Sequence, residues 1–288
     1  MSSEKVFLHL VTVGTSVVRN AERCTDIDED VRKRLLAWAA ARPDSGEDVE
    51  AGNQAYPASR EFQAVMKCLT SDPRRYSAEL NAFIGYLQRL AQQGVKGVNH
   101  IITLFSTDTG VGWFSARVIE EYLKSFVDTD LFTTWGVEGH RIAEVRPPIR
   151  VENLGRDFSE GMINLVAKVR SEVERFRQDV GKRIGFENVR IVANLTGGFK
   201  PESGALLAIA GLIGIDSVYY IHEVFRDVVE LPILPLRIDP AAEQLLLNAL
   251  NDRVGDLEKR LLDRLGLSLE KGKLSPWSKR ILKAFLGR

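Results

Sequence analysis

The sequence predicts an α/β protein with a Rossmann-like, mostly parallel sheet that is flanked by helices and followed by a small helical C-terminal extension. Two observations carry this prediction. Apolar runs of strand length alternate with longer stretches in which apolar residues recur at helical spacing. Three of these runs also end in loops rich in glycine and hydroxyl residues. Strands that alternate with helices are joined by right-handed crossovers, which makes neighbouring strands parallel.

The expected elements follow one another along the chain in this alternating order. We expect strands at 6–13, 98–105, 141–151, 189–195, 217–223 and 231–238. We expect helices at 28–41, 60–70, 74–93 and 113–126, a long helix starting at 157–160, and a small-residue helix at 203–213. Pro147 and Pro148 weaken the third strand, and the prolines of the last strand place it at an edge. The polar stretch 42–59 is predicted to be a surface loop, long enough to act as a lid over a ligand.

The texture of the sequence changes at Pro240, and we divide the chain into a ligand-binding domain, 1–239, and a C-terminal extension, 240–288. Residues 241–265 are predicted to form one amphipathic helix. The last 18 residues hold six basic side chains and no acidic one. We favour a solvated helix here, and contact with nucleic acid or an effector through 266–288 is the alternative.

Composition sets limits on partners and compartment. Lys plus Arg equals Asp plus Glu, 39 each, so any anion site must be local. The apolar run at 6–13 is too short for a membrane span or a signal peptide core, so we expect no membrane contact. The two cysteines, Cys24 and Cys68, show no redox motif and no disulfide framework. We interpret them as packing residues of a cytoplasmic protein.

The candidate site is built from the three loops that follow strands, because ligands of such sheets bind beyond the carboxyl ends of the strands. In the loop at 196–200, paired glycines, a helix start and Lys200 form a phosphate cradle, although a tight turn with an exposed lysine fits as well. The loops at 14–16 and 106–110 also fit ordinary helix caps. The expected ligand-binding residues are Gly14, Thr15, Ser16, Ser106, Thr107, Asp108, Thr109, Thr196, Gly197, Gly198, Phe199 and Lys200.

Several other chemistries lack their sequence signature. The chain has no Walker motif, no dinucleotide-binding glycine motif and no nucleophile elbow. None of the four histidines has a partner at metal-ligand spacing, so we expect neither a metal nor a cofactor. We interpret His9 and His100 as structural residues and keep His222 as a minor candidate for a ligand contact.

Three segments resemble the CRISPR-associated Rossmann fold (CARF) sensors. They are Val11-Thr12-Val13-Gly14-Thr15-Ser16, Leu104-Phe105-Ser106-Thr107-Asp108-Thr109 and Asn194-Leu195-Thr196-Gly197-Gly198-Phe199-Lys200-Pro201, and the similarity covers residues 5–238. The resemblance implies a homodimer that binds cyclic oligoadenylate across its twofold axis, and cyclic tetra-adenylate suits that symmetry. It also implies metal-free ring cleavage by a ribose 2′-hydroxyl. Lys200 would stabilise the developing charge, and Ser16 or Thr15 would hold the phosphate or the ribose.

Three functions stay open at this point. A stand-alone ring nuclease is favoured because residues 240–288 carry no effector active site: no histidine follows His222, and the carboxylates of 252–263 belong to a solvated helix face. A sensor that does not cleave, and acts through the C-terminal extension, would use the same loops. Outside the family, a nucleotide-processing enzyme with a Rossmann-like core is the third candidate.

Overall fold

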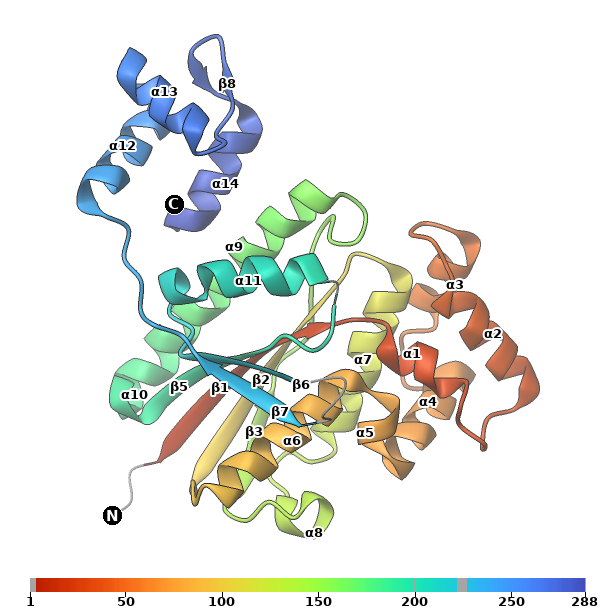
Figure 1. The fold of residues 1–288 in the computed structure, drawn as a ribbon. Helices are drawn as coiled ribbons and strands as arrows, with labels where there is room; N and C mark the ends of the chain where they lie inside the picture. The colour runs from red at the N-terminus through yellow and green to blue at the C-terminus, as the bar shows by residue number, and fades with distance from the viewer. Residues whose placement is uncertain (1–3, 199, 222–226, 288) are drawn as a thin grey trace.

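The computed structural model describes residues 4–198, 200–221 and 227–287 (Figure 1). Within them a seven-stranded sheet has the order β3-β2-β1-β5-β6-β7, and the short β4 also pairs with β2. All its pairings are parallel except that of β6 with β7 at the edge. The strands are β1 Lys5–Val13, β2 Val98–Ser106, β3 His140–Val145, β4 Ile149–Arg150, β5 Val189–Asn194, β6 Ser217–Ile221 and β7 Val228–Pro232. The predicted fold class is therefore confirmed.

The strand register explains why the three polar loops lie at one edge of the sheet. Strand β1 lies between β2 and β5, with Val13 opposite Ser106 and Val11 opposite Asn194. These strands are parallel and end at nearly the same level. The loops that follow them therefore emerge side by side, at the end of the sheet that lies to the right in Figure 1.

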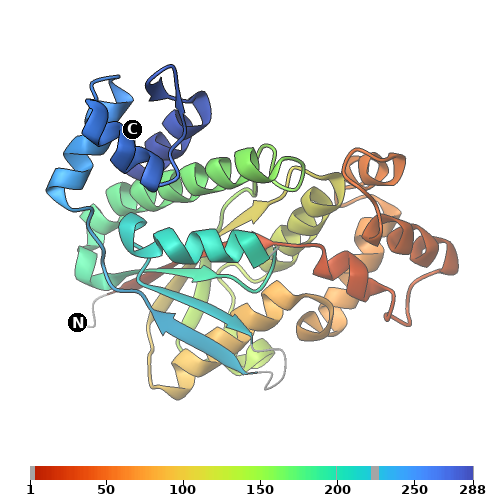
Figure 2. The same ribbon diagram turned by 45° about the horizontal axis from the view of Figure 1, so that its top comes forward.

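Alternating residues of the buried strands pack against helices on opposite faces of the sheet (Figure 2). Val6, Leu8 and Leu10 of β1 face the core under α9 Phe158–Phe176 and α11 Lys200–Ile213. Phe7, Val11 and Val13 of the same strand face α6 Ala78–Gln92 and α7 Gly110–Lys124. The remaining elements of this part are α8 Leu131–Trp135, the π-helix Arg177–Gly181, α10 Lys182–Ile184 and the 3₁₀ turn Phe186–Asn188.

Two predicted strands differ from the structure where prolines interrupt them. The run 141–151 divides into β3 and β4, because Pro147 and Pro148 cannot donate to the ladder. The last strand covers 228–232, so it begins three residues before the predicted 231–238 and ends six residues earlier, and residues 233–238 belong to no strand. Its expected place at the sheet edge is confirmed.

The chain between β1 and α6 forms a layer of helices. This layer lies next to the carboxyl ends of the strands and supplies one wall of the space there. It contains α1 Ser16–Ala21, α2 Glu29–Ala39, α3 Gly46–Asn53, α4 Arg60–Ser71 and α5 Pro73–Tyr76. The prediction that 42–59 is a loop is wrong, because α3 forms there under a Ser45 cap. Gly52 packs against the backbone of Gly110. Gly52, one of the residues that suggested a loop, is thus a helix–helix contact point.

Cys24 and Cys68 form a disulfide, which corrects their interpretation as separate packing residues. The bond joins the turn after α1 to α4, and the two Cα atoms lie 6.0 Å apart. Both side chains are buried in the core of the helical layer. The 44-residue separation in sequence gives no hint of the pairing, since only the helical packing brings the two sulfurs together.

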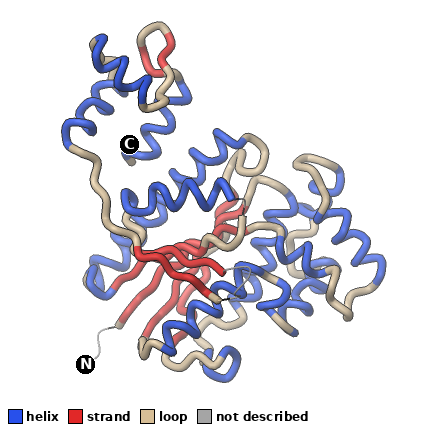
Figure 3. The backbone as a smooth tube through the Cα atoms, viewed as in Figure 1, coloured by secondary structure: helices blue, strands red, loops and turns tan. Residues whose placement is uncertain are grey.

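The C-terminal extension is a compact group of helices and a short hairpin (Figure 3), and it has its own small core. It contains α12 Pro240–Leu250, α13 Asp256–Arg264, the hairpin of β8 Leu269–Glu270 and β9 Lys273–Leu274, and α14 Pro276–Leu286. The predicted single helix 241–265 is wrong, because the chain turns at Asp252, whose φ is 58°, and resumes a helix after Gly255. The small core of the extension is made of the buried apolar side chains Ala249, Leu262, Leu267, Leu274 and Leu282.

Helix α14 holds the C-terminal extension against α9 of the sheet domain (Figure 1). Arg280 forms an ion pair with Glu160, and Arg170 donates to the carbonyl of Phe285. Lys279 pairs with Asp252 inside the extension. Part of the basic tail is thus neutralised within the molecule. In the described part of the chain, no helix has the length and apolar character needed to cross a membrane.

Candidate functional site

The three strand-end loops meet in one pocket at the carboxyl edge of the sheet, with a volume of about 510 Å³. Eight of the residues expected from the sequence line it: Gly14, Thr15, Ser16, Thr107, Thr109, Thr196, Gly197 and Gly198. They come from the ends of β1, β2 and β5, which are adjacent in the sheet. The pocket therefore lies where open α/β sheets bind ligands.

Ser106 and Asp108 are outside the pocket lining. Ser106 is fully buried at the end of β2. Asp108 accepts from Arg150 Nε at 2.9 Å and from the amide of Asn153 at 3.1 Å, and it lies 3.4 Å from Arg156. It fixes the loop after β4, and Gly155 of that loop reaches the pocket.

Phe199 and His222 lie outside the described residues. The backbone of Lys200 is the first residue of α11, two positions after Gly198, while its side chain is not described. The positive end of the α11 dipole therefore begins beside the pocket.

The loop after β2 caps the helix that follows it, so few of the backbone amides there are left to bind a ligand. Thr109 caps α7 by accepting from the amide of Gly112 at 3.0 Å. Asp48 of α3, which is 2% exposed, accepts from the amide of Val111 at 3.0 Å. The first-turn amides of α7 thus already face a carboxylate, so the cap interpretation holds for this loop.

Glu79 of α6 is the central residue that sequence reasoning missed. It is 1% exposed, and its carboxylate accepts from the amide of Gly14 at 2.9 Å and from the Ser16 hydroxyl at 2.6 Å. The Ser77 hydroxyl donates to the same carboxylate at 2.8 Å. The residue lies in the first turn of α6, where the helix dipole favours negative charge. The sequence indicates only that Glu79 follows a serine that can cap a helix. It does not indicate that Glu79 contacts Gly14.

The loop after β5 is joined to Glu79 and to β1. Asn194 donates from Nδ2 to the Glu79 carbonyl at 3.0 Å and accepts from the amide of Thr196 at 3.1 Å. Thr12 donates to the carbonyl of Gly197 at 2.7 Å. These bonds fix the loop relative to both neighbouring elements.

Glycine is required in these loops because their backbones are in contact. A Cβ at Gly14 would lie 2.9 Å from the amide nitrogen of Gly198, and one at Gly197 would lie 2.3 Å from the Glu79 carboxylate. Gly198 has a φ of 88°, in the left-handed region. The two loops therefore approach each other closely, and Ser16 and Gly198 line the same pocket.

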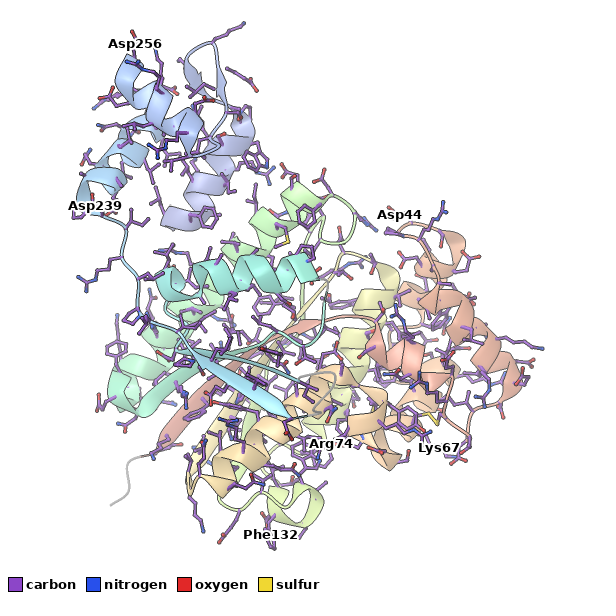
Figure 4. The ribbon with its side chains drawn as sticks, in the orientation of Figure 1. Asp44, Lys67, Arg74, Phe132, Asp239 and Asp256 are labelled. Atoms are coloured by element: carbon purple, nitrogen blue, oxygen red, sulfur yellow. A yellow bond between two sulfur atoms is a disulfide. The ribbon has the colours of Figure 1, made fainter. Side chains whose placement is uncertain are left out.

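The other wall of the pocket comes from α1 and α2. Arg19, exposed on α1 one turn after Ser16, contributes a cation that sequence reasoning did not single out. No carboxylate of the described residues forms an ion pair with it. Trp38 and residues 39–41 line the pocket at the end of α2. Figure 4 labels Asp44, which pairs with Arg156 at 2.6 Å and links this wall to the loop that carries Gly155.

His9, His100 and His140 form a buried hydrogen-bonded chain away from the pocket. His140 Nε2 lies 2.8 Å from the carbonyl of Val95, so that nitrogen carries the proton. His100 must then donate to His140 at 2.9 Å and His9 to His100 at 2.8 Å. Tyr219 donates to His9 Nδ1 at 3.0 Å. Burial lowers the pKa of all three, that of His9 to about 3, which keeps the chain neutral.

The residues described here contain no group of three or more His, Cys, Asp or Glu side chains that is arranged to hold a metal ion. In comparison with known protein families, residues 74–234 match a family described as CRISPR-associated protein (Cas_APE2256). The match covers more than half of the 288 residues and includes α6 with Glu79 and the loop after β5.

Proposed function

Because the chain belongs to the Cas_APE2256 family of CRISPR-associated proteins, we propose that it binds a cyclic oligoadenylate across a homodimer and cleaves it as a metal-independent ring nuclease. Cyclic tetra-adenylate is the first candidate ligand. The observation that carries the proposal is the meeting of Gly14–Ser16 and Thr196–Gly198 in one pocket. These are the segments through which the sequence resembles CARF proteins.

The chemistry of the pocket suits a ribonucleotide. The glycine loop and the start of α11 offer backbone amides and a positive dipole end to a phosphate. Arg19 adds a cation, and Thr15 adds a hydroxyl. The partly exposed Ala39 on the opposite wall adds apolar surface that is suited to a base, while Trp38 beneath it is buried.

Exposed apolar side chains on α11 and on the segment that follows β7 support a homodimer. Leu207 of α11 is 43% exposed, and Leu234 and Leu236 of the following segment are 77% and 53% exposed. The segment packs on α11 at Gly211, one turn after Leu207. A second copy on this face would bury these side chains in a twofold-symmetric interface.

In the proposed reaction, a ribose 2′-oxygen attacks the adjacent phosphorus in line. The new bond joins the 2′-oxygen to phosphorus, and the bond from phosphorus to the 5′-oxygen breaks. The 2′-hydroxyl loses its proton, the leaving 5′-oxygen gains one, and the product carries a 2′,3′-cyclic phosphate. The protein contributes position and charge. Lys200 stabilises the charged phosphate, while Thr15 and Ser16 orient the ribose.

A sensor that does not cleave is the second candidate, and the docking of α14 on α9 favours it. The loop before α9 contributes Gly155 to the pocket, and the first turn of α9 carries Glu160, the partner of Arg280. A ligand that moves this loop would therefore act on the contact that holds the C-terminal extension. In that case the extension would pass the signal to nucleic acid or to an effector.

The deciding experiment is incubation of the protein with cyclic tetra-adenylate in EDTA, with the products separated by chromatography. Linear di-adenylate with a 2′,3′-cyclic phosphate is the expected result. An intact ring that co-elutes with the protein would support the sensor instead. If neither cleavage nor binding occurs with cyclic tetra- or hexa-adenylate, the proposal is wrong.

A further inference from the structure

Ser16 has a hydrogen-bond inventory that can be counted. Its hydroxyl has one proton and two acceptor positions. The proton is used in the 2.6 Å bond to Glu79, and one acceptor position receives the amide of Ala78 at 3.1 Å. One acceptor position is left, and Ser16 lines the pocket.

The count depends on Glu79 being ionised, and its surroundings require this. Its carboxylate receives the amide of Gly14 and the hydroxyl of Ser77 in addition to Ser16. Ser77 itself accepts from the amide of Leu80, so its proton is free to go to Glu79. Three donors and the first turn of α6 stabilise the charged carboxylate.

From this geometry we infer that Glu79 is a positioning residue that makes Ser16 a hydrogen-bond acceptor for a ribose 2′-hydroxyl. The pocket thereby selects ribonucleotides over 2′-deoxyribonucleotides when they bind. A phosphate oxygen has no proton to give, so Ser16 in this state cannot bind phosphate. The inference rests on the proposed function and adds to it the group that Ser16 recognises.

The position of Ser16 favours a 2′-hydroxyl over other donors. Ser16 lines the same pocket as Thr196, Gly197 and Gly198, the loop proposed to bind phosphate. In a 3′-linked ribonucleotide the donor next to the phosphodiester is the 2′-hydroxyl, whereas the adenine amino group lies at the far end of the nucleotide. The same contact would hold the attacking hydroxyl in place.

The test compares the binding of cyclic tetra-adenylate and its all-2′-deoxy counterpart, which cannot be cleaved by this route. Dissociation constants are measured by calorimetry in EDTA with the Lys200→Ala variant, so that the cyclic tetra-adenylate with its 2′-hydroxyls is not cleaved during the measurement. In the wild type, inhibition of cleavage by the deoxy ring gives its affinity independently. We expect about tenfold tighter binding of the ribose ring.

Glu79→Gln provides the sharpest variant. A glutamine nitrogen facing Ser16 would donate to it, so the Ser16 proton would turn toward the ligand. The preference for ribose is then expected to fall to about twofold or less, while the deoxy ring keeps its affinity. Ser16→Ala must lose the preference too, and it keeps the inference testable if Glu79→Gln unfolds. Glu120→Gln is the matched control, because Glu120 is equally buried on α7 and outside the pocket lining.

The outcomes distinguish failure of the role inferred for Ser16 and Glu79 from failure of the proposed function. Equal affinity of the Lys200→Ala protein for both rings would overturn the inference and leave the proposed function intact. A preference that survives Ser16→Ala, or that survives Glu79→Gln in a folded protein, would overturn the role given to that residue. Binding of neither ring to the wild type would overturn the proposed function, and the inference with it.

Discussion

His9 Nε2 and His100 Nδ1 lie 2.8 Å apart in the interior between the sheet and α6. Both side chains are fully buried, and their neutral forms are required for the directed hydrogen-bond chain that ends at Val95. A proton on either ring would place a positive charge in a fully buried site, where its desolvation is costly. This relationship makes the stability of the protein depend on pH.

The first prediction is a loss of stability as the pH falls from 7 to 5. The folded state holds the pKa of His9 at about 3, whereas an unfolded histidine titrates near 6.5. The unfolded state therefore binds more protons below pH 6.5, and the stabilisation present above that pH is lost as pH falls toward 3. His9 alone contributes about 2 kcal/mol between pH 7 and 5, and His100 adds to it in the same direction. Urea unfolding at the two pH values measures the effect.

His9→Gln serves as the control for this prediction, because it removes one titrating group. The difference between the unfolding free energies at pH 7 and pH 5 should then shrink. An equal urea midpoint at both pH values for the wild type would show that the chain does not stay neutral in the folded protein.

The second prediction concerns the disulfide. Reduction, or the Cys24→Ser/Cys68→Ser double variant, should lower the free energy of unfolding by on the order of 2–4 kcal/mol, because the bond closes a long loop in the unfolded chain. It should also weaken ligand binding, since Trp38 and Asp48 within that loop line the pocket. Thermal unfolding with and without a phosphine reductant measures the first effect. Alkylation and mass spectrometry count the thiols, and two free thiols in the native protein would contradict the prediction.

The third prediction is that Lys200→Ala abolishes ring cleavage, by a factor of about 100 to 1000 in rate, while the ring still binds. The reason is that Lys200 starts α11 two positions after Gly198, and its positive charge stabilises the phosphate more strongly as the phosphate becomes more negative in the transition state. Single-turnover rates with radiolabelled ring measure the change. Lys96→Ala is the matched control, since Lys96 precedes β2 at the opposite edge of the sheet and pairs with Glu138. Cleavage by Lys200→Ala at the wild-type rate would refute the mechanism.

The fourth prediction separates glycines that the site needs from those that it does not. Gly197→Ala should destabilise the protein by about 1–3 kcal/mol and abolish ring binding, because the new methyl group would meet Glu79 and the Thr12 carbonyl. Gly204→Ala on the same loop–helix unit has open space and should be neutral or slightly stabilising. Calorimetry and thermal unfolding report both quantities. Equal behaviour of the two variants would mean that the loop does not hold Glu79 closely.

The sequence could predict the features of this structure that depend on residues close together in the chain. The buried runs of β1, β2 and β5 show strands, and the order of elements makes them parallel, so their end loops had to meet. Glu79, Arg19 and the Cys24–Cys68 bond have no such local signal, because each depends on how α1 to α6 fold back over the strand ends. The sequence did not predict α3 because Gly52, which suggested a loop, allows close helix packing against Gly110, and Ser45 caps the helix.

The last prediction addresses the contact between the sheet domain and the C-terminal extension. Arg280→Glu would place two carboxylates together at Glu160 and should loosen α14 from α9, which is otherwise held by Arg170 and by the packing of Ile281 and Phe285. Limited proteolysis of the segment 233–239 should then proceed several times faster. The charge-swapped pair Glu160→Arg/Arg280→Glu should restore the wild-type rate, because the ion pair is re-formed with reversed polarity. If Arg280→Glu releases the extension and ring cleavage continues unchanged, the extension is not needed for the nuclease. If the same release changes nucleic-acid binding only when the ring is present, the contact transmits the ligand signal, as the sensor requires.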